Sequence, residues 1–307
     1  MKKKVFSVMT AAALVFSLTA CSTNAKTEEP ETAAQSSASQ TEAAGAETAE
    51  SSGGASAEAG EKAASGETKA AGDTFTVGFD QDFPPMGFVG DDGEYTGFDL
   101  ELAAEVADRL GLTFVPQPIA WDAKNMELES GNIDCIWNGM TITPELQEAL
   151  TISDPYIKNY QVVVIRSDNA DVYTSTADLV GKTVEAEAGS AGEAAIIGEG
   201  ADESLKQAEY ISAAKQTDTL LEVKTGAADA AVLDFVLAGA MVGQGDYSDL
   251  MIIPDLQLSV EEYGVGFRKD SDAAEKVNEA MQALIEDGTL NTLAEKYDLA
   301  ELLLANQ

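Results

Sequence analysis

The sequence predicts an α/β fold over residues 73–307. Two observations indicate it: short strand patterns alternate with helical patterns, and glycines follow helical patterns just before the next strand. A third observation sets the start of the folded part, because residues 22–72 contain no aromatic or large aliphatic side chain. The length suits one domain or two lobes with a cleft between them, and the pattern alone leaves both open.

The predicted elements follow one another in a βαβ rhythm. The first helix begins at Asp99, which we expect as its N-cap, and places Leu102, Ala103, Val106 and Leu110 on one face before Gly111 ends it. The other predicted elements are strands at 74–79 and 112–115, a helix at 122–130 ended by Gly131, strands at 133–137, 161–165 and 183–186, a helix from Ala191, a strand at 230–233, and a last helix with Val277, Ala280, Met281 and Leu284 inward.

The N-terminus has the pattern of a secretion signal. Three lysines at positions 2–4 precede an uncharged apolar run over 5–20, which is short for a bilayer span, and small residues precede Cys21. Leu-Thr-Ala-Cys at 18–21 resembles the lipobox of bacterial lipoproteins, which implies lipidation of Cys21; the alternative is a chance cysteine after an ordinary signal peptide. We therefore expect a signal peptide at 1–20, and a lipidated cysteine with a disordered tether over 21–72.

The composition excludes several classes of chemistry. The chain has no histidine, which removes the usual base of catalytic triads and the commonest metal ligand, and we expect no catalytic residue, metal or cofactor. Cys135 lies in an apolar run and is expected to be a buried core thiol. The formal net charge of -36 repels nucleic acid and favours cationic or zwitterionic solutes, although solubility alone also explains it.

One sequence run identifies a resemblance to a known family. Gly-Phe-Asp-Leu-Glu-Leu-Ala at 97–103 is similar to the signature of family 3 extracellular solute-binding proteins, the polar amino-acid binders with the type 2 periplasmic-binding fold. Further matching runs are VGFD at 77–80, FPP at 83–85, SGNID at 130–134, GMTITPE at 139–145, SDPY at 153–156 and YGVGFR at 263–268. Their order and spacing together make the resemblance specific across 73–307.

The resemblance implies two α/β lobes joined by two hinge crossings, with lobe 1 formed by 73–163 plus 263–307 and lobe 2 by 164–262. It implies a monomeric substrate-binding component of an ABC importer, lipid-anchored on the extracellular face of the cell membrane, or periplasmic where the cell has an outer membrane. The expected partners are a polar or basic amino-acid ligand and the importer's permease and ATPase subunits. The alternative is an enzyme on the same fold, such as a cyclohexadienyl-dehydratase-like lyase.

The resemblance also assigns candidate ligand-binding residues. Asp234 ends a strand and matches the family aspartate that binds the ligand ammonium, although a helix N-cap explains it equally well. Ser190 and Glu193 have the spacing of a capping box at a helix start, which can receive a carboxylate or be an ordinary cap. The full candidate set is Asp80, Phe83, Trp121, Asn138, Gly139, Thr141, Glu187, Ser190, Ala191 and Asp234.

The side-chain end of the candidate site is expected to be aromatic and acidic. Phe83 and Trp121 match aromatic positions that sandwich the ligand side chain, with core packing as the alternative. Asp80 lies where relatives with cationic ligands place a carboxylate, and Glu187 is on the strand that approaches Ser190. These acidic residues favour a basic or polar amino acid or a related cationic amine.

The sequence departs from the family at Leu146, where relatives carry an arginine that binds the ligand α-carboxylate. Three alternatives follow from this change. A backbone and hydroxyl cradle that includes Thr141 suffices, another cation such as Lys158 substitutes, or the ligand is not an ordinary α-amino acid.

Overall fold

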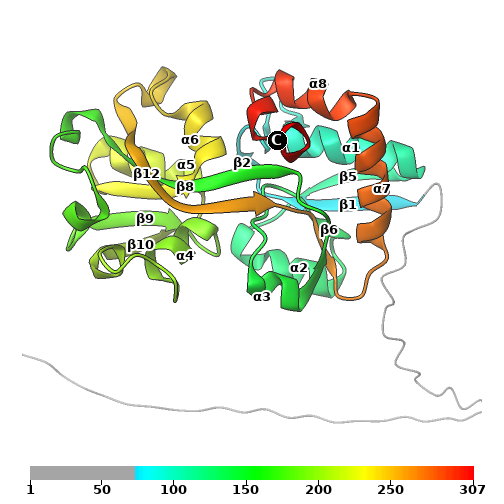
Figure 1. Cartoon of the computed structure of the whole chain (residues 1–307), viewed down its shortest axis with the longest axis horizontal. Coiled ribbons are helices and arrows are strands. Elements are labelled where there is room, and N and C mark those ends of the chain that lie inside the picture. The colour runs from blue at the N-terminus through cyan, green and yellow to red at the C-terminus, as the bar shows by residue number, and fades with distance from the viewer. Residues whose placement is uncertain (1–72) are drawn as a thin grey trace, which may run out of the picture. The chain divides into compact units, whose positions relative to one another are not determined.

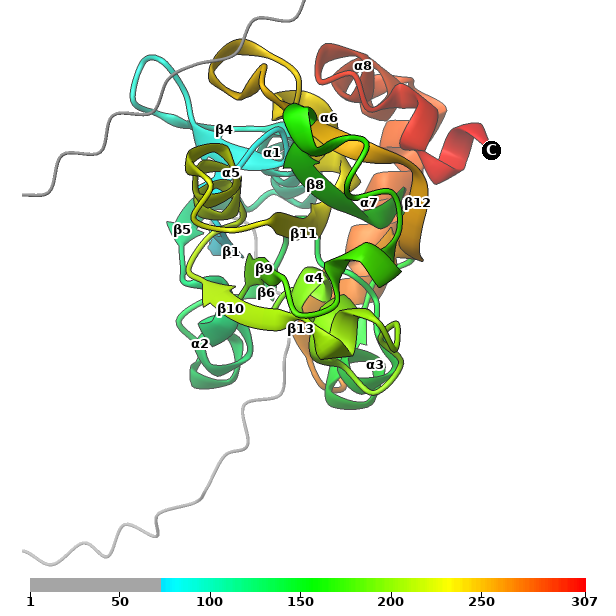
Figure 2. The ribbon, with the colours of Figure 1, turned by 90° about the vertical axis from the view of Figure 1, so that its left-hand side faces the viewer.

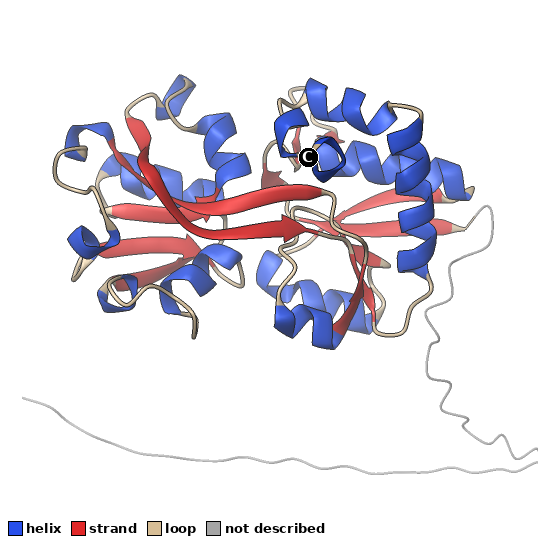
Figure 3. Ribbon diagram, in the orientation of Figure 1, coloured by secondary structure: helices blue, strands red, loops and turns tan. Residues whose placement is uncertain are grey.

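The computed structural model describes residues 73–307. The predicted signal peptide at 1–20, Cys21 and the tether over 21–72 lie outside the described residues. The described chain forms two five-stranded sheets covered by helices and one small three-stranded sheet (Figure 1; Figure 3). The predicted α/β class with two lobes is confirmed. None of the described helices is long and apolar enough to cross a membrane.

The first sheet contains the N-terminal strand and has the order β5-β1-β6-β13-β7. Its strands are β1 (Thr74–Phe79), β5 (Thr113–Pro118), β6 (Cys135–Ile136), β7 (Leu150–Ile152) and β13 (Gly266–Arg268). β1 pairs parallel with β5 and β6, whereas β13 is antiparallel to β6 and β7. Its helices are α1 (Phe98–Leu110), α2 (Lys124–Ser130), α3 (Pro144–Ala149), α7 (Ala273–Glu286) and α8 (Thr289–Lys296). α2 and α3 lie on the opposite side of the strands from α1 and α8 (Figure 1).

The second sheet has the order β10-β9-β11-β8-β12. Its strands are β8 (Ile157–Arg166), β9 (Thr183–Glu187), β10 (Glu209–Ala213), β11 (Ala230–Asp234) and β12 (Leu250–Tyr263). β9 is parallel to β10 and β11, and β8 is antiparallel to β11 and β12. Its helices are α4 (Ala191–Ile197), α5 (Gln216–Thr225) and α6 (Phe235–Met241). Figure 2 shows α4 on the side of the sheet opposite to α5 and α6.

Two long strands, β8 and β12, run side by side between the two sheets (Figure 1). β8 follows β7 of the first sheet, and β12 leads back into β13. A bridge between Thr141 and Tyr263 and another between Ile157 and Leu303 tie these strands to the first lobe. The chain therefore passes between the lobes twice, and the predicted boundaries at 163/164 and 262/263 fall on these strands.

Shorter elements complete the fold. The small sheet consists of β2 (Asp82–Phe83), β3 (Gly87–Val89) and β4 (Tyr95–Thr96). The 3-10 helices are η1 (Trp121–Ala123), η2 (Ser167–Asn169), η3 (Thr176–Leu179), η4 (Leu205–Gln207), η5 (Gly245–Tyr247), η6 (Ala300–Leu302) and η7 (Leu304–Asn306).

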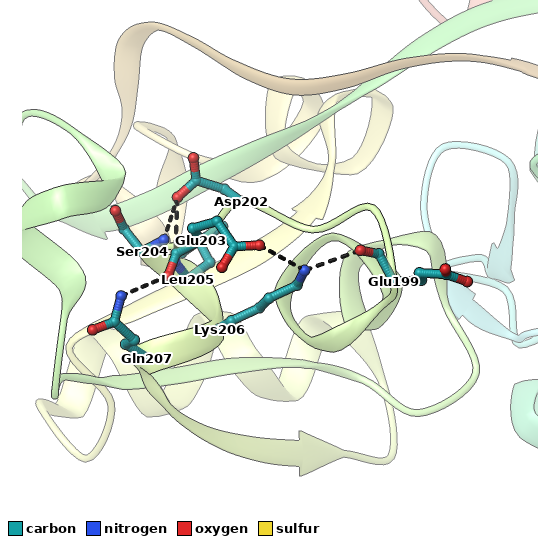
Figure 4. Close-up of polar contacts among 7 residues, drawn as sticks. All are labelled: Glu199, Asp202, Glu203, Ser204, Leu205, Lys206 and Gln207. Atoms are coloured by element: carbon teal, nitrogen blue, oxygen red, sulfur yellow. Dashed lines mark hydrogen bonds and ion pairs between the residues drawn. The ribbon is translucent and has the colours of Figure 1, made fainter.

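The turn before η4 is held by polar contacts of its own side chains (Figure 4). Asp202 Oδ1 accepts from the backbone N–H groups of Ser204 and Leu205 at 2.9 and 3.3 Å, which satisfies donors at the helix start. Lys206 Nζ donates to the Glu199 carbonyl at 2.9 Å and to Glu203 Oε1 at 3.0 Å. These local bonds fix the connection that follows α4.

Apolar side chains from strands and helices form the core of each lobe. Cys135 is fully buried among them as a free thiol, as predicted, and burial raises its pKa well above the usual value. The largest fully buried side chains are Trp137, Tyr263, Phe79, Phe98, Phe267, Met86, Leu102 and Leu128. Burial of such side chains is worth about 1.5–3 kcal/mol each, which makes packing the main source of stability.

Three local predictions differ from the structure. Asp99 is not the N-cap of the first helix: Gly97 occupies that position, and the buried Asp99 carboxylate points to residues outside the helix. The predicted helix over 122–130 begins as the 3-10 turn η1, and α2 starts only at Lys124. The predicted strand over 133–137 is reduced to Cys135–Ile136, because only these two residues have ladder partners.

Candidate functional site

A cavity of about 600 Å³ lies where both lobes contribute side chains. Parallel strands of both sheets end there, since Asp80 follows β1, Asn138 follows β6, Glu187 ends β9 and Asp234 ends β11. The carboxyl edge of parallel strands is the usual place for a ligand in open α/β sheets. All ten residues of the predicted set line the cavity: Asp80, Phe83, Trp121, Asn138, Gly139, Thr141, Glu187, Ser190, Ala191 and Asp234.

Asp80 and Glu187 are buried carboxyl groups with open acceptor positions. Their exposed fractions are 7% and 3%. Within residues 73–307, Asp80 Oδ2 and Glu187 Oε1 have no hydrogen-bond partner. Burial raises the pKa of Asp80 to about 6. Burial, reinforced by the charges of Asp80 and Asp234, raises the pKa of Glu187 to about 9. A cation that enters the cavity therefore stabilises the ionised form of both carboxyl groups.

The Asp234 carboxylate accepts four hydrogen bonds from side chains. Its Oδ1 accepts from Asn159 Nδ2 at 2.6 Å, Gln161 Nε2 at 2.8 Å and Tyr263 Oη at 2.7 Å. Its Oδ2 accepts from Gln216 Nε2 at 2.5 Å. Burial raises its pKa, and these donors oppose that effect. Asp234 is also the N-cap residue of α6, but its side chain makes no capping bond. The carboxylate is therefore oriented by side chains around it rather than by the helix.

Lys124 is the cavity cation that sequence reasoning missed. The side chain is buried, and Nζ donates to the carbonyls of Trp121 at 3.2 Å and Gly189 at 2.8 Å. Nζ also lies 4.8 Å from the centre of the Trp121 ring. Burial lowers the pKa of Lys124, and the nearby Glu187 opposes this. Since Gly189 belongs to the second lobe, Lys124 joins the two lobes across the cavity.

The position that departs from the family adds no charge to the cavity. Leu146 lines it and packs against the small apolar cluster around Ile133 and Met140. Lys158, the suggested substitute, lies on β8 and is not among the lining residues. Only Lys124 supplies a cation among the described residues that line the cavity.

The two predicted aromatic residues lie on the first-lobe side. Phe83 and Trp121 are both largely buried, at 4% and 9% exposure, and both line the cavity. Phe83 also fixes the backbone beside it: Gly139 has φ +59°, and a Cβ there would lie 2.6 Å from Phe83 Cε1. Only glycine fits this close approach.

Ser190 opens α4 as predicted. Its Oγ accepts from the Glu193 backbone N–H at 3.1 Å, which is an ordinary cap. Glu193 does not close a capping box, because its carboxylate accepts from Gly189 N at 2.8 Å and Tyr210 Oη at 2.8 Å. These bonds fix the loop between β9 and α4, where Ser190 and Ala191 line the cavity.

Asp99 holds the loop that follows β6 and contains Gly139. It is fully buried, with Oδ2 accepting from Gly139 N at 2.7 Å and Oδ1 from Tyr156 Oη at 2.8 Å. Burial raises its pKa to about 7. The signature run at 97–103 therefore acts on the site indirectly, by holding the loop that presents Asn138, Gly139 and Thr141.

Two α/β lobes that the chain crosses twice, with a charged cavity between them, define the class of two-lobed solute-binding proteins. Residues 75–300 match the model of bacterial extracellular solute-binding proteins, family 3. The chain belongs to this family.

Similar proteins of known sequence or structure support the assignment. The L-cystine-binding protein TcyJ of Escherichia coli K12 is 30% identical over 226 residues, covering 73% of this chain and 82% of TcyJ. An ancestral arginine-binding protein bound to arginine is 32% identical, with a TM-score of 0.68 and coverage of 74% and 99%. The ancestral amino acid-binding protein AncCDT-1, described as a precursor of cyclohexadienyl dehydratase, is 32% identical, with a TM-score of 0.65 and coverage of 73% and 95%.

Proposed function

We propose that the protein binds a cationic or polar amino acid between its lobes and delivers it to an ABC importer. The observation that carries this proposal is the cavity with three buried carboxyl groups, Asp80, Glu187 and Asp234, against one buried ammonium, Lys124. An amino acid with a positively charged side chain brings two positive groups and one negative group to such a site. The ancestral relative is bound to arginine, and TcyJ is a cystine-binding protein, so both relatives bind amino acids.

Each end of the ligand has a candidate partner. Asp234 binds the α-ammonium, while Asp80 and Glu187 receive the side-chain cation between Phe83 and Trp121. Such charge-assisted contacts are stronger than neutral hydrogen bonds.

The α-carboxylate needs other partners, because Leu146 replaces the arginine of relatives. We assign it to Thr141, the start of α4 at Ser190, and Lys124, whose Nζ uses two backbone carbonyls and retains a third donor. This assignment replaces the suggested role of Lys158.

Ligand capture is coupled to closure of the lobes about β8 and β12. A ligand that contacts both lobes stabilises the closed form by its differential affinity for that form. The contacts that join the lobes away from these strands include Lys124 with Gly189 and an ion pair of 2.7 Å between Lys215 Nζ and Asp82 Oδ2. The monomer is the proposed functional unit, with the importer's permease and ATPase as partners.

Calorimetry against a panel of amino acids tests the binding function. We expect L-arginine and L-lysine to bind more tightly than L-leucine or L-glutamate. Asp234→Asn, which keeps the shape but removes the charge, should weaken binding about 10- to 100-fold. Asp246→Asn, at an exposed position of the same lobe, is the matched control and should leave the affinity unchanged. Tight binding of only acidic or aliphatic amino acids would contradict the proposal.

We also propose a lipid anchor at Cys21 that holds the mature protein at the outer face of the cell membrane through the 21–72 tether. Cys21→Ser should release the protein into the medium or periplasm, detected by fractionation. Retention of the variant in the membrane fraction would contradict the anchor.

A lyase activity is the second candidate function. It is favoured by the Glu187 carboxyl, whose pKa of about 9 would keep it protonated as a general acid at neutral pH. AncCDT-1 provides the fold-level precedent for a related enzyme lineage. Incubation of the purified protein with prephenate or arogenate, followed by chromatography, tests it; turnover that Glu187→Gln abolishes would reverse the order of the two proposals.

A further inference from the structure

Glu261 carries a carboxyl group that lies next to Asp234 but is not among the residues that line the cavity. It belongs to β12 and is opposite Asn159 of β8 in the strand register. Glu261 Oε1 accepts from Asn159 Nδ2 at 2.6 Å and from Gln161 Nε2 at 2.7 Å. The same two amide nitrogens donate to Asp234 Oδ1 at 2.6 and 2.8 Å. One pair of amides therefore holds the two carboxyl groups close together, and each carboxyl group acts on the pKa of the other.

The surroundings of the pair contain little positive charge. Tyr263 Oη donates to Asp234 at 2.7 Å, and Ser259 Oγ lies 3.5 Å from Glu261 Oε2. A third carboxyl group, Glu187, faces Asp234 from the cavity side, and the charge of Asp234 helps to raise the pKa of Glu187. No lysine or arginine within 73–307 forms an ion pair with either carboxyl group. Two ionised carboxylates in such contact repel each other, so the pair favours a shared proton.

We propose that Glu261 is a positioning residue that holds a proton at neutral pH and hydrogen-bonds to Asp234, so that Asp234 presents its charge to the ammonium group of the ligand. The inference rests on the proposed function, because it requires Asp234 to bind the ligand. Burial and the charge of Asp234 raise the pKa of Glu261 to about 8, which agrees with a protonated Glu261. Because β12 passes between the lobes, the charge of the site is linked to a strand of the proposed hinge.

The shared proton makes ligand binding depend on pH in a defined direction. Below pH about 8 the pair carries one negative charge, and above it the pair carries two. A cation beside Asp234 favours the doubly ionised pair, so its binding promotes loss of the proton from Glu261. Affinity for L-arginine should therefore rise as the pH increases through 8. Glutamine at position 261 keeps a donor towards Asp234 but has no proton to lose.

The test compares the wild-type protein with Glu261→Gln, Glu261→Ala and the control Glu262→Gln, whose side chain is exposed on the same strand. Kd for L-arginine is measured by calorimetry between pH 6.5 and 8.5. At pH 6.5 we expect Glu261→Gln to stay within about twofold of wild type and Glu261→Ala to be about tenfold weaker, because the alanine variant lacks the donor to a charged group. The ratio of Kd for Glu261→Gln to that for wild type should rise about threefold or more by pH 8.5, whereas Glu262→Gln should follow wild type throughout.

The pH dependence separates positioning from a merely structural role. A ratio that stays constant with pH, or equal affinities of the alanine and glutamine variants, would overturn the role of Glu261 while leaving the binding function intact. If no amino acid binds, the proposed function fails, and the proton is then sought in the ligand-free protein by ¹³C NMR. A glutamate carboxyl that titrates near pH 8 and is lost in Glu261→Gln but retained in Glu262→Gln would support the shared proton. Absence of that titration would overturn it.

Discussion

Replacing Glu187 by glutamine should stabilise the ligand-free protein and weaken ligand binding. The carboxyl is 3% exposed and has a pKa of about 9, against about 4.5 for the same group in water. At pH values between these two, the folded protein keeps the proton and the unfolded chain loses it. Unfolding then releases a proton, so the contribution of Glu187 to stability decreases as the pH rises from about 4.5 to about 9.

The magnitude follows from this interval. Each pH unit above 4.5 lowers the free energy of unfolding by about 1.4 kcal/mol. The ionisation of Glu187 in the unfolded chain therefore lowers it by about 4 kcal/mol at pH 7.5. Glutamine has similar shape and no ionisation, so Glu187→Gln should recover up to about 4 kcal/mol at pH 7.5 and almost nothing at pH 4.5. For a domain of this size the gain corresponds to an increase in Tm of roughly 10 °C.

Urea denaturation and thermal melts without ligand, at pH 4.5, 6, 7.5 and 8.5, measure the effect. The control Glu209→Gln, at an exposed position of β10, should parallel wild type at every pH. In the same preparations Glu187→Gln should bind L-arginine about 10- to 100-fold more weakly, because it loses a charge-assisted contact. A difference in the free energy of unfolding between Glu187→Gln and wild type that is equal at all pH values would refute the reasoning, because a buried acid must make this difference depend on pH.

The remaining predictions concern the backbone and the cation of the site. Lys124→Met removes the ammonium that bonds the Gly189 carbonyl across the cavity, so calorimetry should show about tenfold weaker ligand binding. The control Lys158→Met should leave Kd unchanged, because Lys158 does not line the cavity. Equal losses of affinity in both variants would contradict the assignment. Gly139→Ala places a Cβ 2.6 Å from Phe83 Cε1 at a φ of +59°, so urea denaturation should show a loss of at least about 2 kcal/mol in the free energy of unfolding. Unchanged stability would mean that the loop relaxes freely.

The local elements of the fold could be predicted because local rules determine them. The strand at Thr74–Phe79 has the bounds that its alternation indicates. Gly111 and Gly131 end α1 and α2 with φ values of +69° and +79°, a conformation that glycine adopts without strain. Strand ends also bring Asp80, Glu187 and Asp234 to one cavity, whereas the set of ten candidate residues that line it was assigned from the resemblance to the family.

The strand β12 could not be predicted in the same way. It is 14 residues long, contains Pro254, and includes Asp255 at a φ of +60° where its register against β8 shifts. Much of it is exposed or half-buried, so its sequence lacks the regular alternation of a sheet buried on one side.

The importance of several polar residues also depends on tertiary contacts. Lys124 begins a short helix and resembles a solvated lysine in the sequence, yet its ammonium reaches the opposite lobe. Asp99 has the sequence position of a helix cap but bonds the Gly139 loop instead. Glu261 becomes notable only when Asn159 brings it against Asp234. Such partners are far apart in the chain, and no local periodicity encodes them.

The fully buried thiol of Cys135 has a practical consequence for reporting ligand capture by fluorescence. It is the only cysteine in residues 73–307, and its inaccessibility makes it inert to maleimide dyes in the native protein. A cysteine introduced at Ile197, which is 52% exposed at the cavity wall, would then be the sole labelled position of a fragment that lacks Cys21. The fluorescence of a dye at this position would report the entry of an amino acid without background from labelled Cys135, so the domain could serve as an optical sensor.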